Sequence, residues 1–291
     1  MTTSTGAPMR YWSPWLGAFV LAWLGAYIAL APHPAELAAQ NGYLVLVGLA
    51  AAFIGNITAV GGGLVFIPVA ILVLHLPPVQ ALKLAILSQC FGMTSGAIAW
   101  AGRGKVPTRL FLAAAPGLLV GSTISSLVVR PSAILVKGVF GPVSVLVGVI
   151  ILATRNRVGT RETLADKALP ALFAVSVLGG LVTGWVAIGE GEIVAAFLIL
   201  VYGLAPERGI GLGVALLSLN SLFLAALHTR FLGGLPWEMG AFTGLGCVFG
   251  ARLGPWVSQR VSQKFLKLAF AAIAITDGLI FTVQFALRHG R

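Results

Sequence analysis

Apolar blocks of membrane-spanning length, separated by short loops, make up most of this sequence. A helix needs about 20 apolar residues to cross the hydrocarbon core of a bilayer. Only 9% of the residues are charged, whereas soluble domains carry about 25%. The sequence therefore predicts an all-α polytopic membrane protein with roughly seven spans. The apolar blocks are residues 12–31, 43–59, 64–75, 79–101, 108–129, 132–153, 168–188, 191–203, 206–227, 236–256 and 265–287.

An internal duplication divides most of the chain into two halves. In each half a helix ends at a glycine-rich break, a short helix follows, and a proline turn leads into three long helices. The landmarks recur at a nearly constant offset, since Gly61 and Gly189 are 128 residues apart, as are Pro78 and Pro206. The predicted organisation is an N-terminal helix and outer loop (1–42), a first repeat (43–153), a linker (154–167) and a second repeat (168–291).

The short blocks 64–75 and 191–203 cannot cross a membrane alone, since each rises only about 18 Å. We expect each to form a re-entrant pair with the helix before it, within 43–75 from outside and within 168–203 from inside. Only then do the loops rich in Lys and Arg all fall in the cytoplasm. Each half then has an odd number of crossings, which predicts an inverted-topology repeat in which each half is a re-entrant pair plus three transmembrane helices.

This topology predicts a bacterial-type inner membrane protein with a cytoplasmic N-terminus and an outer C-terminus. Residues 11–31 are either a retained first helix or a cleaved signal, and both leave residue 32 outside. The formal net charge of +11 lies in short loops and not in a basic run. Orientation in the membrane explains this charge better than nucleic-acid binding.

The glycine breaks are the first candidates for a binding site. Non-helical backbone at membrane depth is tolerated where protein buries it or where it lines a cavity. A short helix that starts at the break directs amide N–H groups and its positive dipole end toward it, which suits an anion. The alternative is that the glycines only allow close packing. The predicted binding residues are Gly61, Gly62, Gly63, Gly189 and Gly191.

Polar side chains in the long helices are further candidates. Ser88 and Gln89 follow the first proline turn, and Ser218 and Asn220 follow the second. They either face the breaks and donate to an anion or form hydrogen bonds between helices. Lys83 and Arg252 lie near helix ends, where they either contact the substrate or extend to the interface.

Three acidic residues are candidates for ion coupling. Glu190 and Glu192 flank the second break, where two carboxylates repel an anion unless one is protonated. Their alternative role is to cap the short helix that begins there. Asp277 lies within the last apolar block, where an ionisable group is costly. It is either a coupling group or the partner of a base such as Lys137 or Arg252.

The sequence contains no motif of a metalloprotease, a serine hydrolase or a phosphate-binding loop, and no Cys/His cluster with metal-ligand spacing. We therefore expect no enzymatic activity, catalytic residue, metal or cofactor. The expected partners are a small anion and the lipid bilayer, and a homo-oligomer is left open. The glycines spaced by four residues at 117 and 121, and at 246 and 250, most simply allow helices to pack closely.

Two segments resemble the sulfite exporter TauE/SafE family of anion permeases. They are GGGLVFIPVAILVLHLPP at 61–78 and GCVFGARLG at 246–254, and the resemblance extends over 43–287. It implies export of a small sulfur-containing anion, such as sulfite or an organosulfonate, by alternating access. The chain departs from the family at Leu84-Ala85 and Leu212-Gly213, where many members have Thr-Ser. The alternatives are an anion channel and a transporter of another small carboxylate or oxyanion.

Overall fold

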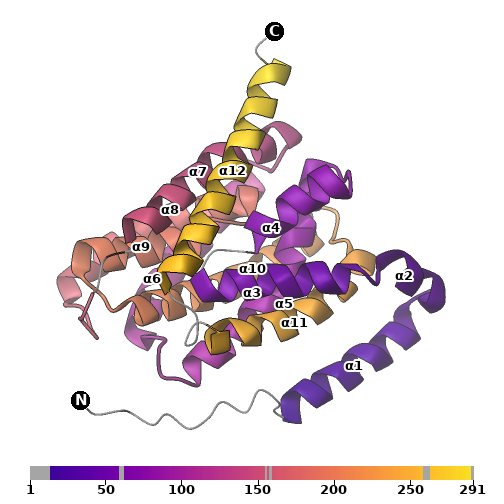
Figure 1. The fold of residues 1–291 in the computed structure, drawn as a ribbon, viewed down its shortest axis with the longest axis horizontal. Coiled ribbons are helices and arrows are strands. Elements are labelled where there is room, and N and C mark those ends of the chain that lie inside the picture. The colour runs from indigo at the N-terminus through magenta and orange to yellow at the C-terminus, as the bar shows by residue number, and fades with distance from the viewer. Residues whose placement is uncertain (1–13, 59–61, 155, 157–158, 258–262, 290–291) are drawn as a thin grey trace.

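The structure is a computed structural model, which describes residues 14–58, 62–154, 156, 159–257 and 263–289. Throughout these residues the fold is all-helical (Figure 1). The long helices are α1 (Pro14–Leu30), α2 (Pro34–Asn41), α3 (Leu44–Thr58), α5 (Pro78–Ala101), α6 (Thr108–Thr123), α7 (Ala133–Thr154), α8 (Leu169–Val186), α9 (Glu190–Tyr202), α10 (Pro206–Phe231), α11 (Trp237–Val257) and α12 (Gln263–His289). The short ones are α4 (Gly63–Pro68), the π-helical turns η1 (Val69–Val73) and η2 (Ile124–Val128), and the 3-10 turn η3 (Asp166–Ala168).

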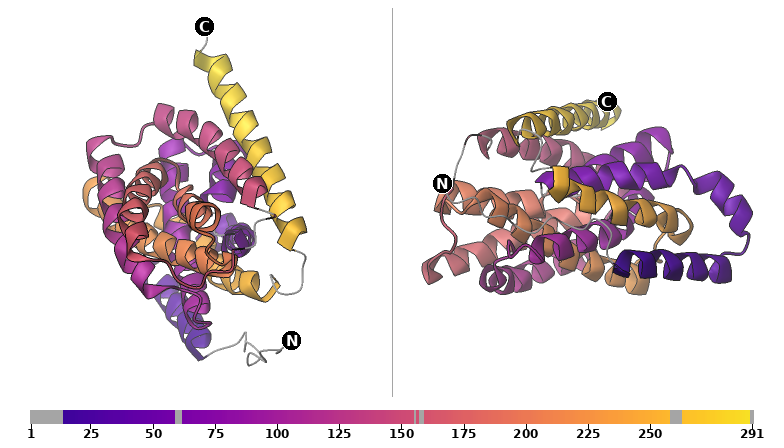
Figure 2. Two further views of the ribbon diagram at one scale, coloured as in Figure 1. Left: turned by 90° about the vertical axis from the view of Figure 1, so that its left-hand side faces the viewer. Right: turned by 60° about the horizontal axis from the view of Figure 1, so that its bottom comes forward.

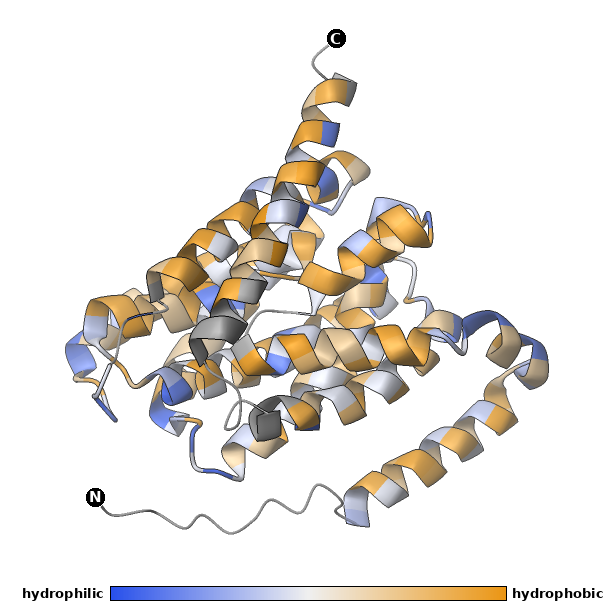
Figure 3. Cartoon of the chain, viewed as in Figure 1, coloured by the Kyte–Doolittle hydropathy of each residue, from blue (hydrophilic) through white to orange (hydrophobic). Residues whose placement is uncertain are grey.

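The helices are long and apolar enough for a multi-pass membrane protein. Five described helices meet that requirement, and a sixth span results if α1 and α2, which meet at a bend of 118°, count together. Hydrophilic residues gather in the loops and in α2, whereas the helices between them are mainly hydrophobic (Figure 3). The sequence predicted roughly seven spans. One difference is α8, which we expected to be part of a re-entrant pair but which reaches span length together with η3.

Proline and glycine set the ends of the helices around the two turns of the duplicated unit. Pro78 and Pro206 occupy the first position of α5 and α10, where the missing N–H costs nothing. Gly203 ends α9 in the left-handed conformation, with φ 67°, which glycine adopts without steric cost. Pro78 and Pro206 are two of the landmarks from which the sequence predicted the duplication.

Glycines bring two helix pairs into close contact. Along α3 and α11, Gly246 faces the Val45 carbonyl oxygen, and Gly250 faces that of Leu49. Along α6 and α8, Gly117 and Gly121 face the carbonyl oxygens of residues 173 and 177 in the same way. Within each pair the two helices run in the same direction. The packing role predicted for these glycines is confirmed, because a Cβ atom at any of them would collide with backbone.

Two other helix pairs are antiparallel. The start of α5 contacts the end of α10, where the Lys83 ammonium donates to the Leu232 carbonyl. The end of α5 leads to Lys105, which pairs with Glu207 at the start of α10. Glycines of α7 contact α12 in reverse order, because Gly138 faces residue 285 and Gly148 faces residue 275. Helix α12 lies at the edge of the bundle beside α7 (Figures 1 and 2).

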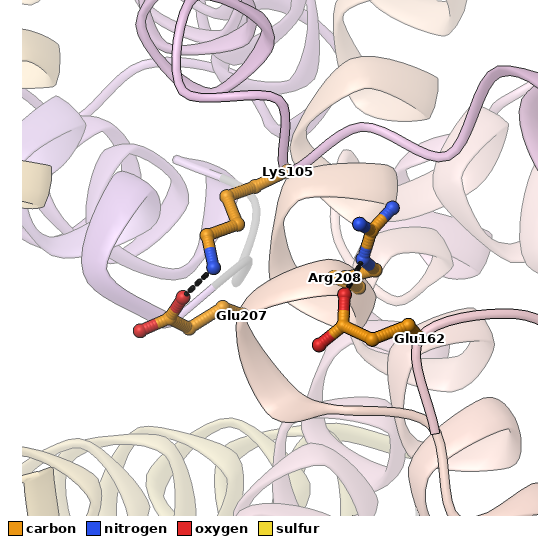
Figure 4. Close-up of polar contacts among 4 residues, drawn as sticks. All are labelled: Lys105, Glu162, Glu207 and Arg208. Atoms are coloured by element: carbon orange, nitrogen blue, oxygen red, sulfur yellow. Dashed lines mark hydrogen bonds and ion pairs between the residues drawn. The ribbon is translucent and has the colours of Figure 1, made fainter. Parts of the chain in front are cut away.

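Three segments meet at one end of the molecule, which we call the basic end: the loop 102–107, the linker 159–168 and the turn 203–208. Lys105 and Glu207 form an ion pair of 2.5 Å, and Arg208 pairs with Glu162 (Figure 4). The linker also pairs with the turn through backbone, since the Arg161 N–H donates to the Gly203 carbonyl over 3.1 Å. The hairpin of α8 and α9 therefore begins and ends at the same end of the protein.

A recess of about 220 Å³ opens at the basic end, lined by side chains that include Arg109, Glu162 and Arg208. Arg109 also forms an ion pair, with Asp166 of η3. The carboxylate side chain of each pair is largely exposed, so each pair stabilises the fold by at most about 1 kcal/mol. Their main effect is to fix which loops lie together.

Candidate functional site

The two helix breaks meet inside the main apolar core. A Cβ atom added at Gly63 would lie 2.5 Å from the Ala187 carbonyl oxygen and 2.9 Å from the Ile188 side chain. The start of α4 therefore rests directly on the backbone between α8 and α9. The core cluster around this contact includes Leu64 and Ile188. Gly62 and Gly63 thus lie where the sequence predicted, and Gly61 falls outside the described residues.

The second break is held open by two unusual backbone conformations. Ala187 is left-handed with φ 54°, and its N–H closes the last turn of α8 by donating to the Thr183 carbonyl over 2.7 Å. Gly189 has φ 113°, which only glycine adopts without strain. A left-handed alanine costs about 1–2 kcal/mol. Strained residues of this kind occur preferentially at functional sites, and sequence reasoning did not select Ala187.

Gln89 connects the two breaks. Its side-chain amide donates from Nε2 to the Ala187 carbonyl oxygen over 2.6 Å, and the residue is buried. A Cβ atom at Gly62 would lie 3.6 Å from Gln89 Cγ, in ordinary contact. The structure therefore brings Gln89 of α5 to both breaks, where its hydrogen bond joins α5 to the backbone of the second break.

The first turn of α9 is capped by side chains of the protein itself. Glu192 accepts from the Gly189 N–H through Oε2 over 3.0 Å. The Glu190 N–H donates to the Thr183 hydroxyl over 3.1 Å, and that hydroxyl donates to the Ile188 carbonyl over 3.2 Å. Gly191 is buried in the same turn. Glu192 thus makes the capping contact that was one of the two alternatives for this residue.

Glu190 lies in a different environment from Glu192. Its side chain is fully buried, and Oε2 accepts from Asn220 Nδ2 over 3.0 Å. Oε1 has no hydrogen-bond partner among the described residues. Asn220 in turn accepts, at Oδ1, the hydroxyl of Ser122 over 2.6 Å. Three helices, α9, α10 and α6, therefore contribute to one buried chain of polar groups, and Ser122 was not among the predicted site residues.

The other predicted site residues do not meet at the breaks. Ser88 donates to Thr243 over 2.7 Å, and Ser218 shares a hydrogen bond of 2.9 Å with Thr94. These are the interhelical hydrogen bonds that we had considered as their alternative role. Lys83 caps the C-terminal end of α10, where a cation is favourable.

Two charged candidates, Arg252 and Asp277, belong to the last two helices, α11 and α12. The Arg252 guanidinium lies 4.8 Å from the ring centre of Trp15 in α1. Asp277 is half-buried on α12, which packs against α7. The ion pairs within the described part of the chain lie at the basic end, and Asp277 belongs to none of them. The ion pair predicted for Asp277 with Lys137 or Arg252 is therefore not found in the described residues.

An apolar helical bundle in which two interrupted helices meet at a buried site defines a class of protein, the multi-pass membrane transporters. The comparison with known families agrees, since a sequence model described as "Sulfite exporter TauE/SafE" matches residues 44–280. The chain belongs to the sulfite exporter TauE/SafE family. The resemblance seen in the two glycine-containing segments is thereby confirmed.

The matches to two curated relatives span most of each relative's length. The chain is 26% identical over 272 residues to "Probable membrane transporter protein ORF9" of Sinorhizobium sp, a match that spans 84% of this chain and 94% of the relative. It is 22% identical over 263 residues to "Probable membrane transporter protein YunE" of Bacillus subtilis (strain 168), spanning 81% and 94%. No solved structure matches the chain. Both relatives are named as transporters, which agrees with the absence of enzymatic motifs.

Proposed function

We propose that this protein is a secondary transporter that exports a small sulfur-containing anion, such as sulfite or an organosulfonate, by alternating access. The observation that carries the proposal is the contact between the two breaks, where Gly63 rests on Ala187 and Gln89 binds the Ala187 carbonyl. The N–H groups of Gly189 and Glu190 are already bonded by Glu192 and Thr183. The donors proposed for the anion are therefore the glycine backbone at the start of α4 and the second N–H of the Gln89 amide, which add no bulk. Motion of one half against the other would expose such a site to each side in turn.

We further propose that the two halves form an inverted-topology repeat. The equivalent helices of the two sequence repeats, α5 with α10 and α7 with α12, are antiparallel. Equivalent helices also pair across the two halves. Helix α3 of the first half packs against α11 of the second, and α8, the equivalent of α3, packs against α6, the equivalent of α11. Both features are expected when a two-fold axis in the membrane plane relates the halves. The Lys and Arg residues at the basic end favour a cytoplasmic location for that end.

Labelling of introduced cysteines tests this orientation. In a variant without Cys90 and Cys247, we expect Ala165→Cys to react with a membrane-impermeant maleimide only from the cytoplasm. Gln40→Cys, in α2, should react only from outside. Both positions are exposed in the structure, so reagent access does not limit the reaction. Reaction of both cysteines from the same side would contradict the proposed orientation.

The transport activity itself is tested in proteoliposomes. We expect saturable counterflow of labelled sulfite, with competition by sulfonates such as sulfoacetate and weaker competition by acetate. A ligand that binds the folded state also raises the unfolding temperature of the purified protein, which gives an independent measure of selectivity. Ion conductance near diffusion rates would favour the channel alternative. Competition by carboxylates as strong as by sulfonates would favour another small anion as the substrate.

Coupling to protons is the remaining part of the proposal, for which the sequence offered Glu190, Glu192 and Asp277. Glu190 and Glu192 lie at the break, whereas Asp277 lies on α12 at the edge of the bundle. A group that couples ion and substrate movement must respond to the state of the substrate site. Glu190 is therefore the strongest coupling candidate. Unlike Asp277 it lies at the break, and unlike Glu192 its side chain does not cap the helix.

A further inference from the structure

Ser122, Asn220 and Glu190 form a continuous hydrogen-bonded chain, which we call the polar relay. All three side chains are fully buried. Ser122 belongs to α6 of the first half, and the other two belong to α10 and α9 of the second half. Ser122 Oγ also lies 3.2 Å from the Gly180 carbonyl oxygen of α8. The polar relay thus joins the two halves next to the second break.

Asn220, the middle residue of the polar relay, can exchange its donor and acceptor atoms by rotation of its side-chain amide. An amide side chain both donates and accepts, and a hydroxyl has one proton to donate. In the present arrangement Ser122 donates to Asn220 Oδ1, and Asn220 Nδ2 donates to the Glu190 carboxylate. Ser122 has two acceptors within reach, Asn220 Oδ1 and the Gly180 carbonyl, but its single proton serves one of them at a time.

We propose that the hydrogen bonds of the polar relay reverse their donor-to-acceptor direction when Glu190 takes up a proton from water. The proton binds Glu190 Oε2, and the Asn220 amide turns over so that Oδ1 accepts the new O–H. Nδ2 then donates to Ser122 Oγ, and the Ser122 hydroxyl donates to the Gly180 carbonyl. Glu190 Oε2, both polar atoms of the Asn220 amide and Ser122 Oγ keep a partner in both states, and loss of the proton to water restores the first arrangement. This inference rests on the proposed function. It assigns Asn220 as the residue that positions the coupling carboxyl group and Ser122 as the residue whose hydrogen bond changes when that group is protonated.

The surroundings of Glu190 support a group that changes charge. A carboxylate inside a membrane protein is costly unless it is paired or protonated, and Glu190 belongs to none of the ion pairs of the described residues. Glu192, two residues further along the same helix, is the charged group that interacts with it electrostatically. The helices packed against α9 are α7, α8 and α10, and α6 supplies Ser122. Helix α8 has no titratable side chain, and those of the others lie toward helix ends: Arg109, Lys137, Glu207, Arg208, His228 and Arg230.

Infrared spectroscopy of the purified protein tests whether Glu190 takes up the proton. We expect a carboxylic-acid carbonyl band that titrates with pH and is missing in Glu190→Gln. In Asn220→Leu the band should appear at a pH about 1–2 units higher, because the carboxylate loses a hydrogen bond to a charged group. Absence of a band that depends on Glu190, or a titration unchanged in Asn220→Leu, would overturn the proposal.

Transport assays test whether Ser122 makes sulfite counterflow respond to the protonation of Glu190. We expect Ser122→Ala to keep sulfite counterflow but to lose its dependence on pH, while the infrared band still titrates. The matched control is Ser125→Ala, because Ser125 is buried on the next turn and its hydrogen bonds go to the carbonyls of residues 122 and 180. A wild-type pH profile in Ser122→Ala would overturn the proposal. Failure of the wild-type protein to transport sulfite would instead overturn the proposed function, and the infrared titration would still decide the Glu190–Asn220 part.

Discussion

Replacement of Gly63 by alanine is expected to reduce the yield of folded protein and to abolish transport. The added methyl group would lie 2.5 Å from the Ala187 carbonyl oxygen and 2.9 Å from the carbonyl carbon. Backbone of the second break must then move, and overpacking of a buried site costs about 1–3 kcal/mol. The movement would also displace the carbonyl that Gln89 binds. Melting temperature and monodispersity of the purified variant measure the first effect, and sulfite counterflow measures the second.

Gly62 provides the matched control on the neighbouring residue. A Cβ atom there would meet Phe66 at 3.4 Å and Gln89 at 3.6 Å, which are ordinary contacts. Gly62→Ala should therefore fold like the wild-type protein. Gly62→Val should also fold but should lose transport, because its branched side chain fills the space beside Gln89 that the anion is proposed to use. Wild-type transport by Gly62→Val would show that this glycine serves packing alone, and normal stability of Gly63→Ala would contradict the tight contact between the breaks.

The sequence was sufficient to predict the features that depend on composition and spacing. The apolar blocks, the proline turns at Pro78 and Pro206 and the glycine contacts between helices each have a local physical cause, and the structure contains them. The second break was predicted from glycine at residues 189–192, whereas in the structure α8 ends at Val186 and α9 already begins at Glu190. The contact of this break with Gly63 was not predictable, because it joins segments far apart in the chain. That contact depends on how the helices pack.

The faces of the helices were harder to predict, because most helices are apolar on all sides. A soluble helix shows which face is buried by the period of its hydrophobic residues, but a membrane helix with lipid on one side and protein on the other does not. Ser88 and Ser218 were therefore predicted at the breaks, although they bond other helices. Ser122 was missed for the same reason, since a serine within a span gives no sign of which neighbour it bonds.

Replacement of each glutamate at the second break by glutamine is expected to give two different defects. Glu192 caps Gly189, and glutamine keeps an acceptor oxygen but removes the charge that favours a helix N-terminus. We therefore expect Glu192→Gln to lower stability by about 1 kcal/mol and to slow all modes of transport together. Glu190 makes no capping contact with its side chain; its carboxylate bonds Asn220. Glutamine at this position resembles the protonated acid permanently.

Two modes of transport in proteoliposomes separate these defects. Exchange of sulfite between equal pools needs the substrate site but no net proton movement, whereas accumulation driven by a pH gradient needs both. Because Glu190→Gln cannot release a proton, it should lose pH-driven accumulation. It should retain exchange within about two-fold of the wild-type rate, which corresponds to a change of about 0.4 kcal/mol in activation free energy. Glu192→Gln should reduce exchange and accumulation in the same proportion and should melt at a lower temperature. If Glu190→Gln accumulates sulfite normally under a pH gradient, Glu190 does not carry the coupled proton, and its bond to Asn220 serves only to hold α9 against α10.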